Sequence, residues 1–358
     1  MTFIQNYDQF LEVFNPFLDR YLSSLRKTSD NMHDSAQLLI DISSQAVNSS
    51  GKRLRPYLVA LGYQIASNQT NLTDEILKAG LIAEIFHSFA LVHDDIIDQS
   101  DTRRGQKTSH ILFAEEHNAK KFKGTDCHFG TSMAILTGDL LIAYSTKLLT
   151  DLNFDTAIKE KAHKCFTDMF INLIIGQYQD VYQSFDNERP SKEMILSTLR
   201  WKSGEYSIEF PLKFGGILGG ASDNLLDFYA KFAKPVGIAF QLKDDLLGIF
   251  GDSQSIGKSN LSDIREGKNT LLINYAFAAA DNEQKSVLNQ ILGDVSAQEN
   301  ELQKVRSILI ETGAKDQVEE EISAMIQSTQ SLIAQSEISQ DHKQILSGFA
   351  DYIINRNR

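Results

Sequence analysis

Four aspartates lie within eight residues of the segment LVHDDIIDQSDTRRG, which spans residues 91–105. They are Asp94, Asp95, Asp98 and Asp101, and two arginines follow them at positions 103 and 104. Carboxylates this close repel one another unless positive charge lies among them. On a helix, Asp94 and Asp98 share one face with Asp95 beside them, so three carboxylates are expected to converge. Hard cations such as Mg²⁺ prefer these oxygen ligands and complete their shells with water and phosphate oxygens.

A solvated acidic helix face is the alternative interpretation, and for an isolated DDxxD pattern it is the more frequent one. The surrounding residues argue against it here. Residues 81–97 are predominantly apolar, which leaves little room for a helix that faces solvent. The acids are therefore expected to line a cavity within the core.

A second acidic pair, Asp244 and Asp245, follows another apolar stretch in FQLKDDLLGIFGD, residues 240–252. By itself this pair is a weak signal, since adjacent acids are common. The two pairs lie 150 residues apart (244 minus 94), and each ends an apolar helical segment. Metal sites in helical bundles are built from side chains on facing helices, so the two pairs predict facing walls of one metal site.

Composition and charge narrow the class of protein. The 358 residues are 42% hydrophobic, which is enough for a substantial core. Cys127 and Cys165 are far apart, which favours two reduced thiols in a reducing compartment. The sequence has neither a signal-peptide pattern nor a run of about 18 uncharged apolar residues. We expect a cytoplasmic protein without integral membrane association.

The net charge of −12 argues against nucleic acid as a partner.

Apolar residues recur at helical spacing along most of the chain, whereas alternating, strand-like patterns are scarce. The clearest helical segments are 77–92, 133–149, 162–181, 225–250 and the residues from 308 onward. The last of five prolines is Pro235, so no later residue interrupts a helix in that way. No low-complexity linker and no repeat divides the chain. The sequence predicts an all-α protein that forms one domain over residues 1–358.

Seven segments, in order between about residues 50 and 272, resemble the motifs of the trans-prenyltransferases of the polyprenyl diphosphate synthase family. They are GKRLRP at 51–56, LVHDDIIDQSDTRRG, GDLL at 138–141, GQYQD at 176–180, KSGEYS at 202–207, FQLKDDLLGIFGD, and GKSNLSDIREGKNTLL at 257–272. The resemblance implies the isoprenoid synthase fold, a single large helical bundle with a central cavity. It also implies condensation of isopentenyl diphosphate with an allylic diphosphate.

The resemblance implies that both acidic motifs bind Mg²⁺, with three ions in all. These ions would hold the allylic diphosphate. By matched position, Asp94 and Asp98 are the principal ligands of the first motif and Asp95 supports them. Asp244 serves the second motif with Asp245. Metal ions would supply the positive charge that lets the aspartates lie together. The departure is Gly248, where many relatives carry a third aspartate; the third ion then depends on Asp244, Asp245, water and Asp252.

The basic residues that match diphosphate contacts fall into two groups. Those of the allylic diphosphate are Arg103, Lys202, Lys258 and Lys268, joined by Gln241, and those of isopentenyl diphosphate are Lys52, Arg55, His87 and Arg104. Arginine suits this role because its planar fork binds phosphate oxygens in a bidentate way. Taken singly, each charged residue would more often form a surface ion pair, and His87 would be a core histidine. Gln177 and Asp180 match a family motif beside the site. Direct contact at the site and a helix-capping or supporting role are equally compatible with them.

Chain growth is expected to proceed along the helix of the first motif, away from Asp94. Phe89 lies about 7.5 Å back along that helix, and we interpret it as the floor of the pocket, with Ala90 leaving space beside it. Packing in the core is the alternative for Phe89. A floor of this kind resembles synthases of geranylgeranyl diphosphate; farnesyl and longer-chain synthases are the alternatives. His93 is interpreted as structural.

Two other functions remain as alternatives. A terpene cyclase shares the helical scaffold but has no need of a separate isopentenyl diphosphate pocket, so Lys52, Arg55 and Arg104 argue against it. A catalytically silent subunit of a heteromeric synthase can lose metal ligands, whereas both acidic clusters stand here. A homodimer is expected by resemblance only. Arg356 and Arg358 at the C-terminus form either a basic lid or a frayed end, and fraying is favoured.

Overall fold

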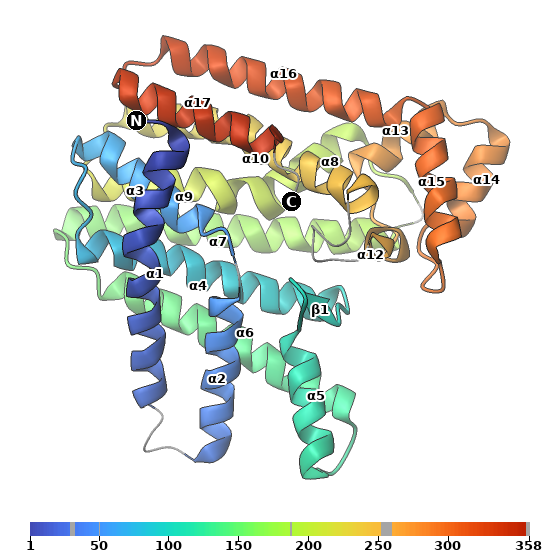
Figure 1. Cartoon of the computed structure of the whole chain (residues 1–358), viewed down its shortest axis with the longest axis horizontal. Helices are drawn as coiled ribbons and strands as arrows, with labels where there is room; N and C mark the ends of the chain where they lie inside the picture. The colour runs from blue at the N-terminus through green and yellow to red at the C-terminus, as the bar shows by residue number, and fades with distance from the viewer. Residues whose placement is uncertain (29–32, 50, 187, 252–259, 356–358) are drawn as a thin grey trace. The chain divides into compact units, whose positions relative to one another are not determined.

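The computed structural model describes residues 1–28, 33–49, 51–186, 188–251 and 260–355 (Figure 1). Within these ranges the chain is almost entirely helical, which confirms the all-α prediction. The strands of this part are β1 (Thr102–Arg103) and β2 (Gln106–Lys107), which pair antiparallel as a small hairpin. The predictions for Asp252, Lys258, Arg356 and Arg358 lie outside the described residues.

The chain divides into two compact units. The N-terminal unit comprises Gln5–His163 and Phe214–Gly220, and the C-terminal unit comprises Met1–Ile4, Lys164–Lys213 and Ala221–Arg358. Each unit is described by itself below. The expectation of a single domain over residues 1–358 stays a prediction.

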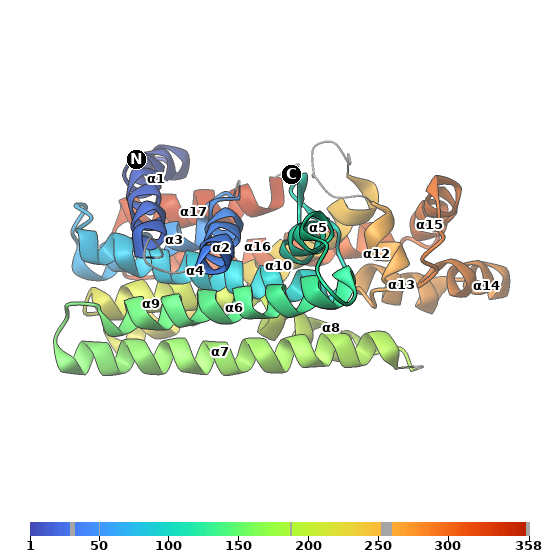
Figure 2. The ribbon, with the colours of Figure 1, turned by 90° about the horizontal axis from the view of Figure 1, so that it is seen from below.

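The N-terminal unit is built around α4 (Asp74–Ile97), which packs against α2, α3 and α6. Its other helices are α1 (Phe3–Thr28), α2 (Asp34–Asn48), α3 (Leu54–Ser67), α5 (Ser109–Lys120), α6 (Asp126–Thr150) and the start of α7 (Thr156–Phe185). α5 packs against α6, and Figure 2 shows α5 nearly end-on beside the α6 ribbon. Gly80 allows the close packing of α4, because a Cβ there would lie 3.2 Å from Phe14 and 3.3 Å from Pro56.

α4 is apolar around nearly its whole circumference, which is typical of a buried helix. It is the one helix of the described residues that is long and apolar enough to cross a membrane by length and composition. In this structure 78% of its most apolar window is buried, as in the core helix of a soluble protein. Acidic residues Asp74 and Glu75 in its first turn favour its start, since they complement the helix dipole.

The C-terminal unit is built around α10 (Asp223–Phe250), which packs against a π-helix, η1 (Arg200–Glu209), and against α16 (Ala314–Gln335) and α17 (Gln340–Asn355). The others are α8 (Lys192–Leu199), α9 (Phe210–Leu218, shared with the N-terminal unit), α12 (Leu261–Arg265), α13 (Leu271–Ala279), α14 (Asn282–Ile291) and α15 (Glu299–Glu311). Ser222 caps α10 by accepting a hydrogen bond from the Leu225 backbone N–H. α10 and η1 touch through their backbones, because a Cβ on Gly237 would lie 2.6 Å from the Cα of Gly204.

Candidate active site

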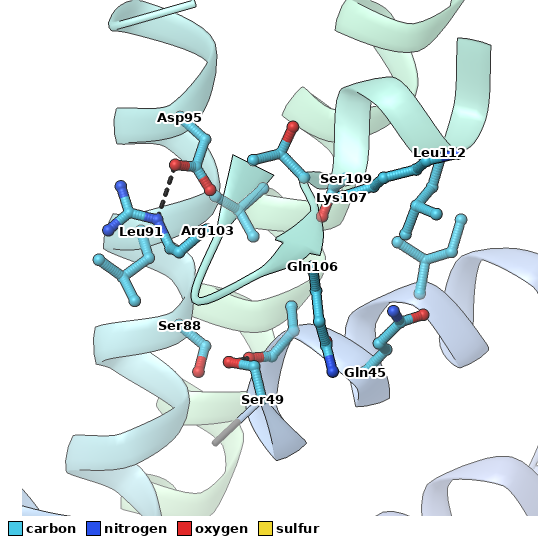
Figure 3. Close-up of a pocket in the computed structure, with 14 residues that line it drawn as sticks. Gln45, Ser49, Ser88, Leu91, Asp95, Arg103, Gln106, Lys107, Ser109 and Leu112 are labelled. Carbon is cyan, nitrogen blue, oxygen red and sulfur yellow. Dashed lines mark hydrogen bonds and ion pairs between the residues drawn. The ribbon is translucent and has the colours of Figure 1, made fainter. Parts of the chain in front are cut away.

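The first acidic motif lies where α4 ends: Asp94 and Asp95 are in its last turn and Asp98 is its C-cap residue. Arg103 of β1 supplies a counter-charge. Its Nε donates to Asp95 Oδ1 at 2.7 Å (Figure 3). Its Nη2 lies 3.5 Å from Asp94 Oδ2. The repulsion among the aspartates is therefore relieved partly within the chain itself.

The β-hairpin that carries Arg103 has the geometry of a tight two-residue turn. Arg103 pairs with Gln106, and the two residues between them, Arg104 and Gly105, have φ values of 52° and 74°. Two consecutive positive φ values are those of a type I′ turn, which favours glycine, asparagine or aspartate. An arginine at such a position is uncommon, and strained residues of this kind cluster at functional sites.

Asp95 is only 5% exposed, and its side chain helps to line a small pocket of about 40 Å³ with Ser88, Arg103 and Gln106. Burial raises the pKa of Asp95 to about 6, Arg103 opposes this, and the charges of Asp94 and Asp98 add to it. Among the residues the structure describes, no three His, Cys, Asp or Glu side chains lie close enough to hold an ion unaided. The expected convergence of three carboxylates is thus incomplete, because Asp95 is bound to Arg103.

His87 lies two helical turns before Asp94 on α4 and is 7% exposed. Burial lowers its pKa well below the usual value, and the positive charges of Arg55, Arg104, Arg103 and Arg53 lower it further. His87, Arg55 and Arg104, which the resemblance assigns to one pocket, thus lie near enough for the arginine charges to act on the imidazole.

The tip of the β-hairpin approaches the GKRLRP segment. A Cβ at Gly51 would lie 2.9 Å from Arg104 Nη1, so this glycine leaves room for the guanidinium. Arg104 Nη1 also lies 3.4 Å from the backbone oxygen and the Oγ of Ser49. Lys52 is held at the same segment, because its backbone oxygen accepts a hydrogen bond from the Tyr7 hydroxyl. Contacts from distant parts of the chain thus hold the Arg104 side chain and the Lys52 backbone in place.

Sequence reasoning missed Arg53, which forms a buried ion pair with Glu84 of α4 and donates to the backbone oxygen of Val47 at 3.0 Å. Arg53 and Glu84 are 8% and 3% exposed. Removing one partner of such a pair would leave a buried charge, at a cost of about 3–5 kcal/mol of stability. The signal that could have revealed it is Glu84 itself, a lone acid in an apolar helix, which requires a partner.

The buried histidine predicts a pH dependence. The folded-state pKa of His87 lies below its unfolded value of about 6.5, so below that pH the unfolded chain binds a proton first. The contribution of His87 to the free energy of unfolding should therefore decrease as the pH falls from 7.5 to 5.5. Urea unfolding of His87→Gln should show a shallower decrease than the unsubstituted protein. His128→Gln, at an exposed position, should keep the original slope, and equal slopes for all three proteins would contradict the assignment.

The second acidic motif lies in the last turns of α10. Gln241 Nε2 donates to Asp245 Oδ1 at 3.2 Å, one turn away. Asp245 Oδ2 is buried and has no hydrogen-bond partner among the described residues. Burial raises the pKa of Asp245 to about 7, Gln241 opposes this, Asp263 and Asp244 add to it, and Lys268 opposes it. A buried carboxylate oxygen of this kind is a position that a cation or a donor would satisfy.

The departure at Gly248 has a structural explanation. A Cβ at this position would lie 2.0 Å from Asp263 Oδ2, so the carboxylate of α12 takes the space that a side chain at 248 would need. Asn260 ties the start of this segment to α10 by donating to the backbone oxygens of Gly248 and Gly251 at 2.9 and 3.1 Å. The acidic group of the second motif thus includes Asp263, which sequence reasoning missed although its segment SDIREGK was noted.

Lys202 lies in η1, which approaches α7 closely, since a Cβ at Gly176 would lie 2.4 Å from the Lys202 backbone nitrogen. Its Nζ donates to Asp180 Oδ2 at 2.5 Å. This contact is compatible with a supporting role for Asp180, and both roles that the sequence left open stay predictions. Lys268 Nζ is paired with Glu266 at 2.7 Å. π-Helical turns are frequent at functional sites, which agrees with the position of Lys202.

Comparison with known proteins identifies the family. Residues 36–309 match the polyprenyl synthetase family model, which is most of the chain. The chain belongs to this family. It is an enzyme, a prenyltransferase with the isoprenoid synthase fold, and members of the family need a divalent metal ion.

Individual relatives agree with this assignment. The chain is 30% identical to a short chain isoprenyl diphosphate synthase of Methanocaldococcus jannaschii. The matched 279 residues cover 77% of each protein. It is 31% identical to a geranylgeranyl diphosphate synthase of Sulfolobus acidocaldarius, over 86% of this chain and 85% of the other. A crystal structure of geranylgeranyl pyrophosphate synthase from Corynebacterium glutamicum, complexed with isoprenyl diphosphate and magnesium, is similar with a TM-score of 0.92. It is 31% identical and covers 98% of this chain and 99% of the other.

Proposed function

We propose that this prenyltransferase condenses isopentenyl diphosphate with an allylic diphosphate to make a short-chain product, geranylgeranyl diphosphate. The observation that carries the proposal is the basic cluster of Arg55 and Arg104 around buried His87, two turns from the acidic end of the same helix. Residues of α3, of the β-hairpin and of α4 would thus form a metal-free anion pocket beside a set of metal ligands. A terpene cyclase would need only the second of these. A cytoplasmic location without integral membrane association is part of the same proposal.

The acidic residues of both motifs fit Mg²⁺ by their donor chemistry. Asp94 and Asp98, with Asp95, would hold ions at the first motif, and Asp244 with Asp245 would hold one at the second, three ions in all. The bound ions would neutralise charge that develops on the departing diphosphate. Support comes from the buried Asp245 Oδ2, which lacks a partner among the described residues. The incomplete carboxylate sets also agree with Mg²⁺, which takes one or two carboxylates and fills its shell with water and phosphate oxygens.

The basic residues would bind and orient the two diphosphates. Asp95 engages Nε of Arg103 and Asp94 lies 3.5 Å from its Nη2, so Nη1 would be the atom that meets phosphate oxygens of the allylic substrate. Lys202, Lys268 and Lys258 would add point charges to the same group, and Gln241 supports Asp245. Neutral His87 can donate one hydrogen bond to isopentenyl diphosphate without repelling the arginines around it. The allylic cation is attacked by the isopentenyl double bond, and the departing diphosphate accepts the proton, so no side chain is required as nucleophile.

Product analysis tests the proposal. The purified protein would be incubated with labelled isopentenyl diphosphate, Mg²⁺ and, in turn, the dimethylallyl, geranyl and farnesyl primers. We expect geranylgeranyl diphosphate from every primer, and no condensation when a chelator removes the metal. A farnesyl or a longer product would keep the reaction but contradict Phe89 as the floor of the pocket. Absence of Mg²⁺-dependent condensation would favour the silent subunit.

We also propose that the enzyme is a homodimer. α7 carries a stripe of exposed apolar side chains at helical spacing, namely Ile171, Ile174, Ile175, Tyr178 and Tyr182. Apolar surface that is contiguous in this way is typical of an interface. Ile174→Glu should convert dimer to monomer in light scattering, because it places a charge within that stripe. Ile310→Glu, on an isoleucine of α15 that is 59% exposed, should leave the dimer intact. A dimer that survives Ile174→Glu would place the interface elsewhere.

A further inference from the structure

Three aromatic rings of α4, those of Phe86, Phe89 and His93, form a continuous stack that we call the aromatic ladder. The centroids of Phe86 and Phe89 are 5.5 Å apart with planes at 61°, and those of Phe89 and His93 are 4.9 Å apart at 69°. Both are edge-to-face contacts, the arrangement that aromatic pairs prefer. Phe89 is 4% exposed and is held by a ring on either side.

The imidazole of His93, the ring of the ladder nearest the acidic turn, is held in turn by α6. His93 Nε2 lies 3.2 Å from the backbone oxygen of Ile135, and because a carbonyl oxygen only accepts, Nε2 must carry the hydrogen. A Cβ at Gly138 would lie 2.1 Å from His93 Nε2 and 2.3 Å from its Cδ2. The imidazole therefore sits in a notch on α6 that only glycine leaves open.

We infer that His93 is a positioning residue that sets product length by fixing the ring of Phe89. The notch at Gly138 and the Ile135 carbonyl hold the imidazole, and the imidazole edge holds Phe89 from the side of the acidic turn. Without that contact, Phe89 would lose the ring that flanks it on the side of the acidic turn, and its side chain would gain freedom to rotate and open the floor to a longer chain. This inference rests on the proposed function and on Phe89 as the floor. It assigns a role to His93 that sequence reasoning did not.

Two substitutions break the contact from opposite sides. His93→Ala removes the imidazole, and Gly138→Ala expels it from its notch. Each should raise the ratio of longer products to geranylgeranyl diphosphate by roughly threefold to tenfold, the range that an edge-to-face aromatic contact supports. Gly138→Ala should add nothing in the His93→Ala background, because the ring it expels is already absent. The kcat for the first condensation should change little, since His93 contacts neither substrate nor metal in this scheme.

Further variants separate the ring from its hydrogen bond and guard against misfolding. His93→Asn keeps a donor for the Ile135 oxygen but lacks the ring, so it should shift products as His93→Ala does. His128→Ala, on an exposed histidine of α6, should leave the products unchanged, and circular dichroism should report native helicity for all variants. An unchanged product spectrum in folded His93→Ala or His93→Asn, with the unsubstituted enzyme active, overturns the inference. Absence of condensation by the unsubstituted enzyme overturns the proposed function itself.

Discussion

Asp94→Asn is expected to lower kcat/KM for condensation by about a thousandfold, the effect of losing one group that stabilises developing charge. The substitution keeps the shape of the side chain but removes the negative charge that we assign to metal binding. Asp94 also has two acidic neighbours whose repulsion would be relieved, so thermal stability should hold or rise. Activity would be measured as Mg²⁺-dependent incorporation of labelled isopentenyl diphosphate, and stability by thermal unfolding.

The matched control is Asp74→Asn, at an exposed aspartate in the first turn of the same helix. It removes the same charge from α4 at the opposite end and should keep normal kcat/KM, with a stability loss of about 0.3–1 kcal/mol from the helix dipole. Asp244→Asn should resemble Asp94→Asn if both acidic groups serve one reaction. An Asp94→Asn enzyme with near-normal activity at saturating Mg²⁺ would remove Asp94 from the metal-binding role.

Arg104→Ala is expected to raise the KM for isopentenyl diphosphate roughly 10- to 100-fold, since a hydrogen bond between charged groups contributes about 1.5–3 kcal/mol. This pocket lacks metal in our proposal, so arginine must neutralise the diphosphate directly. The KM for the allylic primer should change much less. Arg104→Lys should recover part of the loss, because it restores the charge but not the planar fork. Steady-state kinetics with each substrate varied in turn would check these values.

The control is Arg26→Ala, on an exposed arginine whose partner is Asp41. Such a surface pair contributes little, so both KM values should remain unchanged. Arg103 would be a poor control because its loss would leave the buried carboxylate of Asp95 without its partner. If Arg104→Ala raised the KM of both substrates equally, the assignment of Arg104 to isopentenyl diphosphate would be wrong.

The sequence was sufficient for the helical class, the family and the positions of both acidic motifs. The apolar periodicity of residues 77–92 and 225–250 reappears in α4 and α10. The geometry of a helix depends only on nearby residues. The sequence therefore predicted that His87, Asp94 and Asp98 lie on one helix, with distances along its axis set by their sequence separation. The roles of the matched residues remain proposals.

Tertiary structure alone decided which side chains meet. Arg103 neutralises Asp95, Asp263 fills the space beside Gly248, and His93 enters the notch at Gly138. The last two contacts join residues 15 and 45 positions apart (263 minus 248 and 138 minus 93). Helical periodicity indicates which face of a helix is buried, but the partner of that face depends on how helices pack and on the shape each side chain leaves open. A sequence read one segment at a time contains no such information.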